Sequence, residues 1–257
     1  MLQMTTYGED ADDGDAGRPP LLIVHGLFGS GRNWRAIARR MARLRRVTTV
    51  DMRNHGDSPR ADSQSYADMA DDLAETIGAL GGQADVLGHS MGGKAAMVLA
   101  LSRPQLVRRL LVADIAPVAY AHSQNHLIAA MRGLDLARIG SRSQADEALS
   151  ASIDSPQLRA FLLQSLDLEA RRWRLNLDVL ERDMALITGF PEIEGRFDGP
   201  SLFLSGKDSD YVRAEHRARI KALFANARFA KIPGAGHWLH AERPRAFIAA
   251  AEAFFNA

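Results

Sequence analysis

The sequence predicts an α/β fold with a mostly parallel central sheet that helices flank on both faces. Short apolar runs of strand length alternate with helix-like segments through both ends of the chain, which is typical of parallel strands joined by crossover helices. One stretch breaks this alternation, because residues 118–196 contain helix-like segments and no strand-like run. A length of 257 residues suits one large domain, or one domain with an insertion.

Residues 21–24 are an apolar run that is too short for a helix and apolar enough to be a buried strand. The other segments predicted as strands are residues 47–50, 84–87, 110–113, 201–204 and 228–232. The acidic, glycine-containing stretch 9–17 predicts a surface loop between two early strands.

Helices are predicted between these strands from apolar residues at helical spacing. Residues 66–80 are an example, because Met69, Leu73 and Ile77 recur on one face and two glycines follow. The others are residues 35–44, 95–100, 215–224 and 245–255.

The stretch without strands predicts a helical cap inserted between two sheet strands, on the side where the active site should lie. Its expected helices are residues 125–131, 144–149, 156–165 and 172–186. The predicted domains are therefore a core of residues 1–117 and 197–257, and a cap of residues 118–196.

Composition excludes several classes of function. The formal net charge of +1 argues against a dedicated partner of nucleic acid or of a membrane surface. The absence of cysteine excludes disulfides, thiolate metal sites and a cysteine nucleophile. No run approaches the ~18 apolar residues of a membrane span, and the first residues lack the pattern of a signal peptide, so we expect a soluble, cytoplasmic protein.

The segment Gly88-His89-Ser90-Met91-Gly92 carries the strongest chemical signal. It is a G-x-S-x-G motif between a predicted strand and a helix, the context of a nucleophile elbow, in which a sharp turn presents the serine at the carboxyl end of a sheet. The same stretch nearly matches a phosphate-binding loop. Ala95 stands where that loop needs a serine or threonine hydroxyl for magnesium, so nucleotide binding is not predicted.

A serine nucleophile needs a base, and the base needs an orienting acid. The candidate base is His237, which follows the last predicted strand after the small residues Gly234, Ala235 and Gly236. His122 and His126 lack the glutamate of a zinc-binding H-E-x-x-H motif, and neither a metal nor another cofactor is predicted.

Stabilising an oxyanion requires two backbone N–H donors. The residue after the nucleophile, Met91, is expected to supply one. The loop His25-Gly26-Leu27-Phe28-Gly29 follows an early strand, and the N–H of Leu27 is the choice for the second. We expect Phe28, His89 and Trp238 to line the substrate pocket.

Taken together, these motifs resemble the α/β-hydrolase fold over essentially the full chain. More narrowly, the chain is similar to the esterase family that includes the bacterial YbfF-like esterases and the animal abhydrolase-domain 11 proteins. Six segments carry the resemblance in order: residues 25–34, 51–59, 88–94, 114–117, 173–177 and 234–242. The resemblance implies a serine ester or thioester hydrolase without a cofactor. In the strand numbering of the fold, its cap follows the sixth strand.

The triad acid has several candidates. Most α/β-hydrolases place it after the seventh strand, here residues 201–204, where the usual spacing falls on Ser209 and leaves the flanking Asp208 and Asp210. The alternative is after the sixth strand, where Asp114 stands, and the YbfF-like pattern implies Asp114. Asp178 in the cap is a distant candidate.

The predicted function is hydrolysis of carboxylic esters or thioesters of small to medium acyl groups through an acyl-enzyme on Ser90. The triad would be Ser90, His237 and Asp114. The same triad could instead hydrolyse carbon–carbon bonds or carry out perhydrolysis, and a non-catalytic binding protein of this fold is a third hypothesis. The partner is expected to be a small acyl ester or thioester; the sequence does not determine the oligomeric state.

Overall fold

A seven-stranded sheet forms the centre of the computed structural model, which describes residues 1–8 and 18–257; the loop predicted at residues 9–17 lies outside the described residues. The strand order is β1-β3-β2-β4-β5-β8-β9. Only β1 runs antiparallel to its neighbour, and the other strands pair in parallel. The predicted α/β class with a mostly parallel sheet is therefore confirmed. The strands are β1 Gln3–Tyr7, β2 Leu21–Val24, β3 Val47–Asp51, β4 Ala84–His89, β5 Val107–Ala113, β8 Ser201–Gly206 and β9 Ala227–Ile232.

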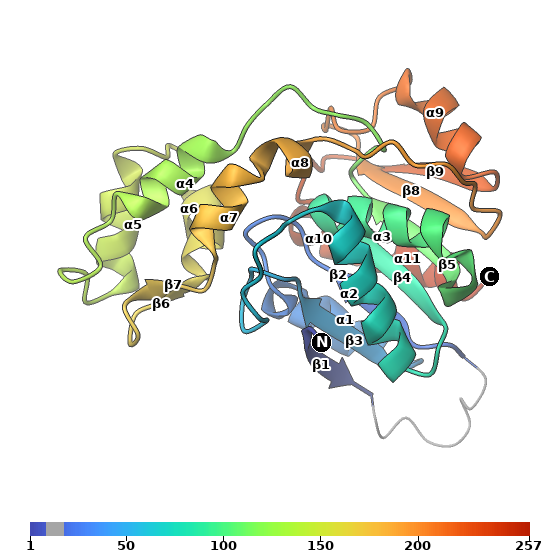
Figure 1. The fold of residues 1–257 in the computed structure, drawn as a ribbon, viewed down its shortest axis with the longest axis horizontal. Coiled ribbons are helices and arrows are strands. Elements are labelled where there is room, and N and C mark those ends of the chain that lie inside the picture. The colour runs from blue at the N-terminus through green and yellow to red at the C-terminus, as the bar shows by residue number, and fades with distance from the viewer. Residues whose placement is uncertain (9–17) are drawn as a thin grey trace.

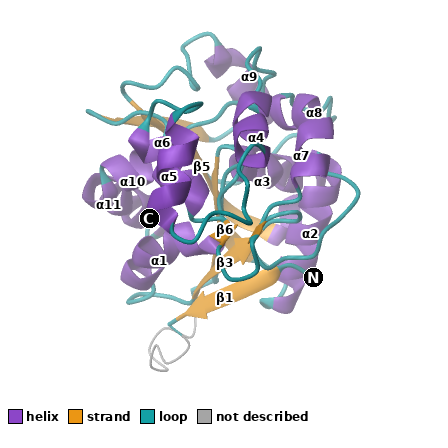
Figure 2. Cartoon of the chain, turned by 90° about the vertical axis from the view of Figure 1, so that its left-hand side faces the viewer, coloured by secondary structure: helices purple, strands orange, loops and turns teal. Residues whose placement is uncertain are grey.

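Helices cover both faces of this sheet, as Figure 2 shows with α1, α10 and α11 on one side and α2 and α3 on the other. Each face buries its own apolar cluster, which explains why β2, β3, β4 and β8 are buried along their whole length. Within the described residues, no helix has the length and apolar character needed to cross a membrane. The core helices are η2 Gly31–Trp34, α1 Arg35–Met41, α2 Tyr66–Ala79, α3 Met91–Ser102, η3 Pro104–Leu106, α9 His216–Leu223, α10 Leu239–Glu242 and α11 Pro244–Phe255.

A mostly helical segment separates β5 from β8 and lies to one side of the sheet in Figure 1. Its helices are α4 Asn125–Arg132, α5 Arg142–Ser150, α6 Pro156–Leu163, α7 Leu177–Arg182 and α8 Met184–Thr188. It falls within residues 118–196, the segment predicted as a cap, and we use that name for it below.

Two predictions for the cap are wrong. A two-stranded hairpin, β6 Leu166–Asp167 with β7 Arg172–Trp173, stands where no strand was predicted, and the single helix predicted at 172–186 is replaced by β7, α7 and α8. The reason is pairing across the chain, because Gly56 N–H donates to Arg174 O (2.7 Å) and Asn176 N–H to Asn54 O (2.9 Å). These bonds hold residues 174–176 in an extended conformation against the core. This tertiary pairing outweighs the helical propensity of the segment.

The parallel arrangement gathers the predicted site at one edge of the sheet. His25, Ser90 and Asp114 each follow the carboxyl end of a parallel strand, and His237 lies in the loop after β9. The carboxyl ends of parallel strands meet at the same edge, so residues far apart in the sequence become neighbours there.

The opposite end of β4 is anchored by a buried ion cluster. The Asp85 carboxylate is fully buried and pairs at 2.6 Å with Arg45, whose side chain is 2% exposed, and at 2.6 Å with Arg108. Without Asp85, the buried guanidinium of Arg45 would lose its counter-charge. The cluster therefore stabilises the strand that carries Ser90.

We predict that Asp85→Asn lowers the free energy of unfolding by about 3–5 kcal/mol, because it leaves the charge of Arg45 buried and unpaired. Urea unfolding of the two proteins measures the difference. The control is Asp135→Asn, which breaks an exposed pair with Arg138 and should cost less than about 1 kcal/mol. Equal losses in the two variants would contradict this account of β4.

Candidate active site

Ser90 lies at a sharp turn between β4 and α3. Its backbone has φ 52° and ψ −120°, a strained conformation for a residue with a side chain. The turn is held by Ser90 N–H, which donates to Ala113 O (3.1 Å), and by Ser90 O, which accepts from Lys94 N–H (3.0 Å). The apolar strand and the buried helix on either side thus fix the serine at the carboxyl edge of the sheet.

Two glycines of the motif are required by the close approach of backbones. A Cβ on Gly92 would lie 2.4 Å from His25 O, and a Cβ on Gly88 would lie 2.4 Å from Gly92 O. No side chain fits at these distances, so the start of α3 rests directly on the ends of β2 and β4. This contact brings the serine next to the loop that follows β2.

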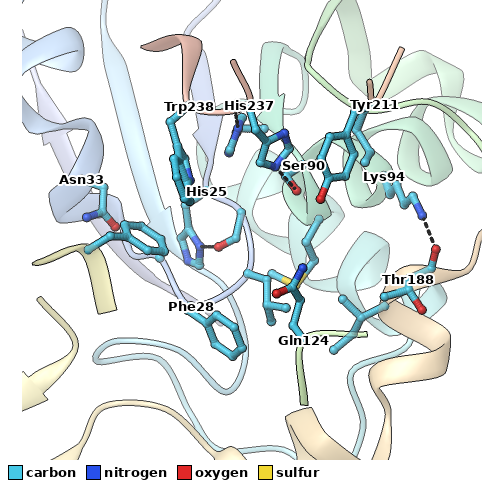
Figure 3. Close-up of a pocket in the computed structure, with 18 of the residues that line it drawn as sticks. His25, Phe28, Asn33, Ser90, Lys94, Gln124, Thr188, Tyr211, His237 and Trp238 are labelled. Carbon is cyan, nitrogen blue, oxygen red and sulfur yellow. Dashed lines mark hydrogen bonds between the residues drawn. The ribbon is translucent and has the colours of Figure 1, made fainter. Parts of the chain in front are cut away.

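His237 lies between the serine and an aspartate. Its Nε2 is 3.0 Å from Ser90 Oγ and its Nδ1 is 2.8 Å from Asp114 Oδ2 (Figure 3 shows the contact with Ser90). Asp114 is fully buried, and its other oxygen accepts from Gly206 N–H at 3.1 Å. The geometry fits a hydroxyl, an imidazole base and an orienting carboxylate in the order that nucleophilic catalysis requires.

The other aspartates considered from the sequence lie elsewhere. Asp208 and Asp210 are exposed and do not contact His237. Asp178 is on the cap surface, 88% exposed, and pairs with Arg132. His122 precedes α4 and contacts Tyr211, and within the described residues no group of three or more His, Asp or Glu side chains is arranged to hold a metal ion.

Two residues of the site were not predicted from the sequence. Ser209 donates its hydroxyl to Asp114 Oδ2, and the ring of Tyr211 stacks on the imidazole of His237 with centroids 4.0 Å apart. His89 donates Nε2–H to His237 O at 2.9 Å. One sequence signal could have indicated that Ser209 lies near His237. The usual spacing of the acid in this fold falls on Ser209.

The loop after β2 forms a turn in which Gly29 N–H donates to Gly26 O at 3.0 Å. Within the described chain, the N–H of Leu27 in this turn has no protein acceptor. Met91 is the first residue of α3, where backbone N–H groups lack a partner within the helix. Leu27 and Met91 both line the cavity that contains Ser90, so both free donors are available to an oxygen there.

Two buried histidines hold this turn in shape. His25 donates Nδ1–H to Gly26 O (2.7 Å) and accepts from Met52 N–H at Nε2 (2.9 Å). His55 donates Nδ1–H to Arg53 O and accepts from Phe28 N–H at Nε2 (3.2 Å). Each ring must be neutral to accept, and burial lowers the pKa of His25 to about 4 and that of His55 to about 3.

A cavity of about 300 Å³ surrounds Ser90 and lies between the core and the cap. In Figure 3, Phe28 and Trp238 lie on one side of the serine, and Lys94 and Thr188 on the other. His89 also lines it, so the lining includes all three residues expected at the pocket. The volume lies at the lower end of the range for small-molecule sites.

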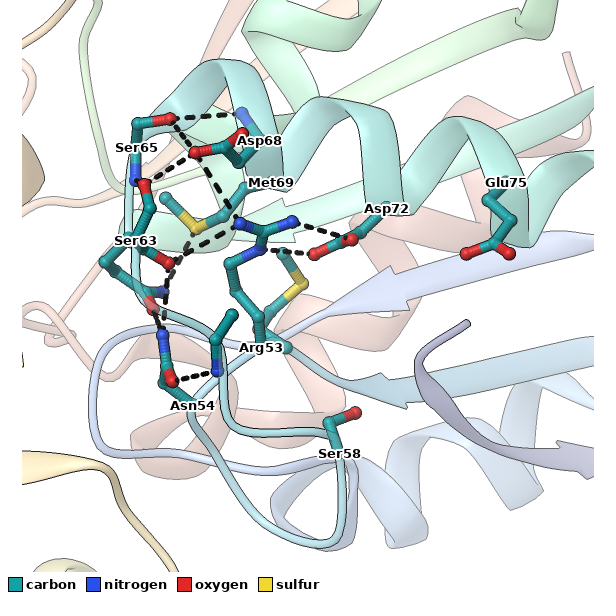
Figure 4. Close-up of polar contacts among 12 residues, drawn as sticks. Arg53, Asn54, Ser58, Ser63, Ser65, Asp68, Met69, Asp72 and Glu75 are labelled. Atoms are coloured by element: carbon teal, nitrogen blue, oxygen red, sulfur yellow. Dashed lines mark hydrogen bonds and ion pairs between the residues drawn. The ribbon is translucent and has the colours of Figure 1, made fainter. Parts of the chain in front are cut away.

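The loop at 52–65 includes most of the segment 51–59 that carries part of the resemblance, and none of its residues lines the cavity around Ser90. Arg53 forms a bidentate pair with Asp72 of α2 at 2.6 and 2.9 Å (Figure 4). Asp57 accepts from Arg174 of the cap at 2.7 Å and from Arg32 at 3.0 Å. The loop therefore joins the core helices to the cap.

Lys94 is a buried cation, 1% exposed, one turn after Ser90. Its Nζ donates to Thr188 O (2.8 Å) and to Gly189 O at the end of α8, and it lies 4.7 Å from the ring centroid of Tyr120. Among the described residues it has no carboxylate partner, and burial lowers its pKa to about 7. It connects α3 to the cap.

Comparison with known proteins identifies the family of the chain. The profile of the Alpha/beta hydrolase family matches residues 21–251. The chain is 43% identical to the mouse sn-1-specific diacylglycerol lipase ABHD11 over 94% of this chain and 82% of that protein, and 39% identical to the Escherichia coli esterase YbfF over 92% and 93%. A solved marine microorganism esterase has a TM-score of 0.91 and 40% identity, covering 98% of each chain.

The fold and the site thus define a hydrolase of the α/β type. The chain belongs to the alpha/beta hydrolase family, and its similarity to the YbfF and ABHD11 proteins confirms the resemblance seen in the sequence. It is an enzyme of the esterase and lipase type.

The buried charge of Lys94 leads to a prediction about pH. Because the pKa is lowered in the folded state, the unfolded chain binds the proton more strongly between pH 7 and about 10.4, and this residue's contribution to stability rises with pH in that window. As pH falls across this window the contribution decreases, and it is lost once pH has fallen through the folded-state pKa of about 7.

We expect the stability difference between the wild type and Lys94→Met to move in favour of the wild type by about 1 kcal/mol per pH unit from pH 7 to 9. Urea unfolding at pH 6, 7, 8 and 9 measures it. Exposed Lys221→Met is the control, with a difference that should not change with pH. A constant difference for Lys94→Met would show that the ammonium is not held in a desolvated site.

Proposed function

We propose that this protein hydrolyses carboxylic esters or thioesters of small to medium acyl groups through an acyl-enzyme on Ser90. The observation that carries the proposal is the chain of contacts from Ser90 Oγ to His237 Nε2 (3.0 Å) and from His237 Nδ1 to Asp114 (2.8 Å). The small cavity supports the size of the acyl group, and the names of the relatives, esterase and diacylglycerol lipase, support an ester substrate.

In this mechanism, His237 accepts the hydroxyl proton as Ser90 Oγ attacks the acyl carbonyl. The N–H groups of Leu27 and Met91 donate to the oxyanion of the tetrahedral intermediate. His237 then gives its proton to the leaving alcohol or thiol, which leaves the acyl group on Ser90. Water attacks that ester, His237 accepts a proton from the water, and the collapse of the second intermediate returns a proton to Ser90.

Asp114 would serve as the orienting acid. Its Oδ2 accepts from Nδ1–H of His237, which places the lone pair of Nε2 toward the serine and stabilises the imidazolium that forms. The bonds from Gly206 N–H and Ser209 Oγ keep the buried carboxylate in place. Residues 118–196 would act as the cap that encloses the acyl group beside it.

We expect Ser90→Ala to lower kcat/KM for p-nitrophenyl butyrate by at least about 10³-fold, because no other group supplies the nucleophile. Ser102→Ala, on the exposed end of the same helix, is the matched control and should keep the wild-type rate. An active Ser90→Ala protein would refute the acyl-enzyme. A panel that adds acyl-CoA thioesters and β-diketones tests the leaving group against carbon–carbon cleavage.

The acid is tested separately. Asp114→Asn should lower kcat by about 10²–10⁴-fold, since the amide favours the wrong imidazole tautomer, whereas Asp208→Asn and Asp210→Asn should stay within about twofold of the wild type. Steady-state kinetics with the same ester measures all three. A large loss in Asp208→Asn or Asp210→Asn, with Asp114→Asn active, would reverse the assignment.

A further inference from the structure

The turn that carries the N–H of Leu27 contains three successive peptide units, and each one is held by a different side chain. The orientation of the Leu27 N–H is fixed by its own peptide plane, because the N–H of a trans peptide points opposite to the carbonyl of the preceding residue, here Gly26. That carbonyl accepts from His25 Nδ1–H and from Gly29 N–H. The first peptide unit is therefore held from within the core.

The second unit is the peptide between Leu27 and Phe28, whose N–H donates to His55 Nε2. His55 lies in a loop that pairs with the cap, because residues on both sides of it bond to Arg174 and Asn176 and His55 itself bridges to Leu175. The histidine that holds the second unit is thus itself placed by contacts with the cap.

The third unit, the peptide between Phe28 and Gly29, is held by the cap directly. Ser165, which follows α6 and is 6% exposed, donates its hydroxyl to Phe28 O at 2.9 Å. Next to it, Gln164 Oε1 accepts from Asn33 Nδ2 at 2.6 Å, just after the turn. Ser165 O accepts from Arg174 N–H at 2.8 Å. The cap residue that holds the third unit is therefore bonded to the cap segment that contacts the loop of His55.

The turn needs such support because Phe28 has a φ of +63°, a conformation that is unfavourable for a residue with a side chain. A strained turn persists only where its surroundings hold it. Loss of the bond from Ser165 would leave a buried carbonyl unpaired and allow the turn to relax, which would redirect the N–H of Leu27.

We propose that Ser165 is a positioning residue for the oxyanion hole, and that docking of the cap on the turn at 26–29 sets the direction of the Leu27 N–H. The inference rests on the proposed function, in which that N–H donates to the oxyanion. It makes the cap a part of the catalytic machinery, because the peptide unit that Ser165 holds also carries Gly29 N–H, which donates to the Gly26 carbonyl of the Leu27 peptide.

The test compares Ser165→Ala with Ser165→Thr, which keeps the hydroxyl, and with Ser152→Ala, an exposed cap serine that does not contact the turn. The readouts are kcat and KM for p-nitrophenyl butyrate and the inhibition constant of a trifluoromethyl ketone, which forms a tetrahedral oxyanion adduct with an active-site serine. Ser165→Cys, nearly isosteric with serine and a weak donor, replaces the alanine variant if that variant does not fold.

We expect Ser165→Ala to lower kcat and to weaken the ketone by about tenfold each, with KM changed less than about twofold, since a misdirected donor affects the transition state and not the ground state. Ser165→Thr should recover most of both values, and Ser152→Ala should match the wild type. Wild-type values in Ser165→Ala, or a change confined to KM, would overturn the inference while the proposed function stands. Activity in Ser90→Ala would instead mark the failure of the proposed function.

Discussion

The close approach of the backbones of β2, β4 and α3 at Gly92 is the constraint on which the rest of the site depends. With no side chain at this position, the start of α3 lies against the end of β2, where a Cβ would be 2.4 Å from His25 O. The contact brings the turn with Ser90 beside the turn with Leu27, so the proposed nucleophile and the two N–H groups proposed to bind the oxyanion line one cavity. The sheet places Asp114 and His237 at the same edge, and the site is assembled from loops that the core holds rigidly.

The buried histidines around this site are held in their neutral form. Burial lowers the pKa of His25, His55, His89 and His240. The rings of His25 and His55 each donate to one backbone group and accept from another. His89 donates to His237 O, and His240 stacks on Trp34 with centroids 4.3 Å apart. Neutral histidines can fix backbone groups without placing a positive charge beside the imidazole of His237. Lys94 is the exception, because its buried Nζ donates to Thr188 O and Gly189 O at the end of α8 and has no carboxylate partner among the residues that the structure describes.

The parts of the fold that depend on local pattern could be predicted from the sequence. The strand at 21–24 is a continuous apolar run, and the G-x-S-x-G motif places Ser90 between strand and helix. The acid could not be chosen that way, because β5 and β8 are parallel neighbours and aspartates follow both of them. The resemblance favours Asp114, and in the structure its carboxylate lies 2.8 Å from His237 Nδ1, whereas Asp208 and Asp210 do not contact His237.

The hairpin β6–β7 and the extended residues 174–176 were not predicted, because local pattern does not determine them either. The two short strands pair with each other, and the residues that follow them bond to residues 54 and 56, more than a hundred positions earlier. No local pattern carries that information. The same holds for Ser165, which looks like an ordinary serine after a helix. Its contact with Phe28 follows from how the cap meets the core.

The structure of the protein with a phosphonate bound covalently to Ser90 tests the central claim most directly. The account predicts that the phosphoryl oxygen accepts hydrogen bonds from the N–H groups of Leu27 and Met91, while His237 stays on Asp114 and Ser165 stays on Phe28. An adduct whose oxygen points away from both N–H groups, or a label on a residue other than Ser90, would contradict it.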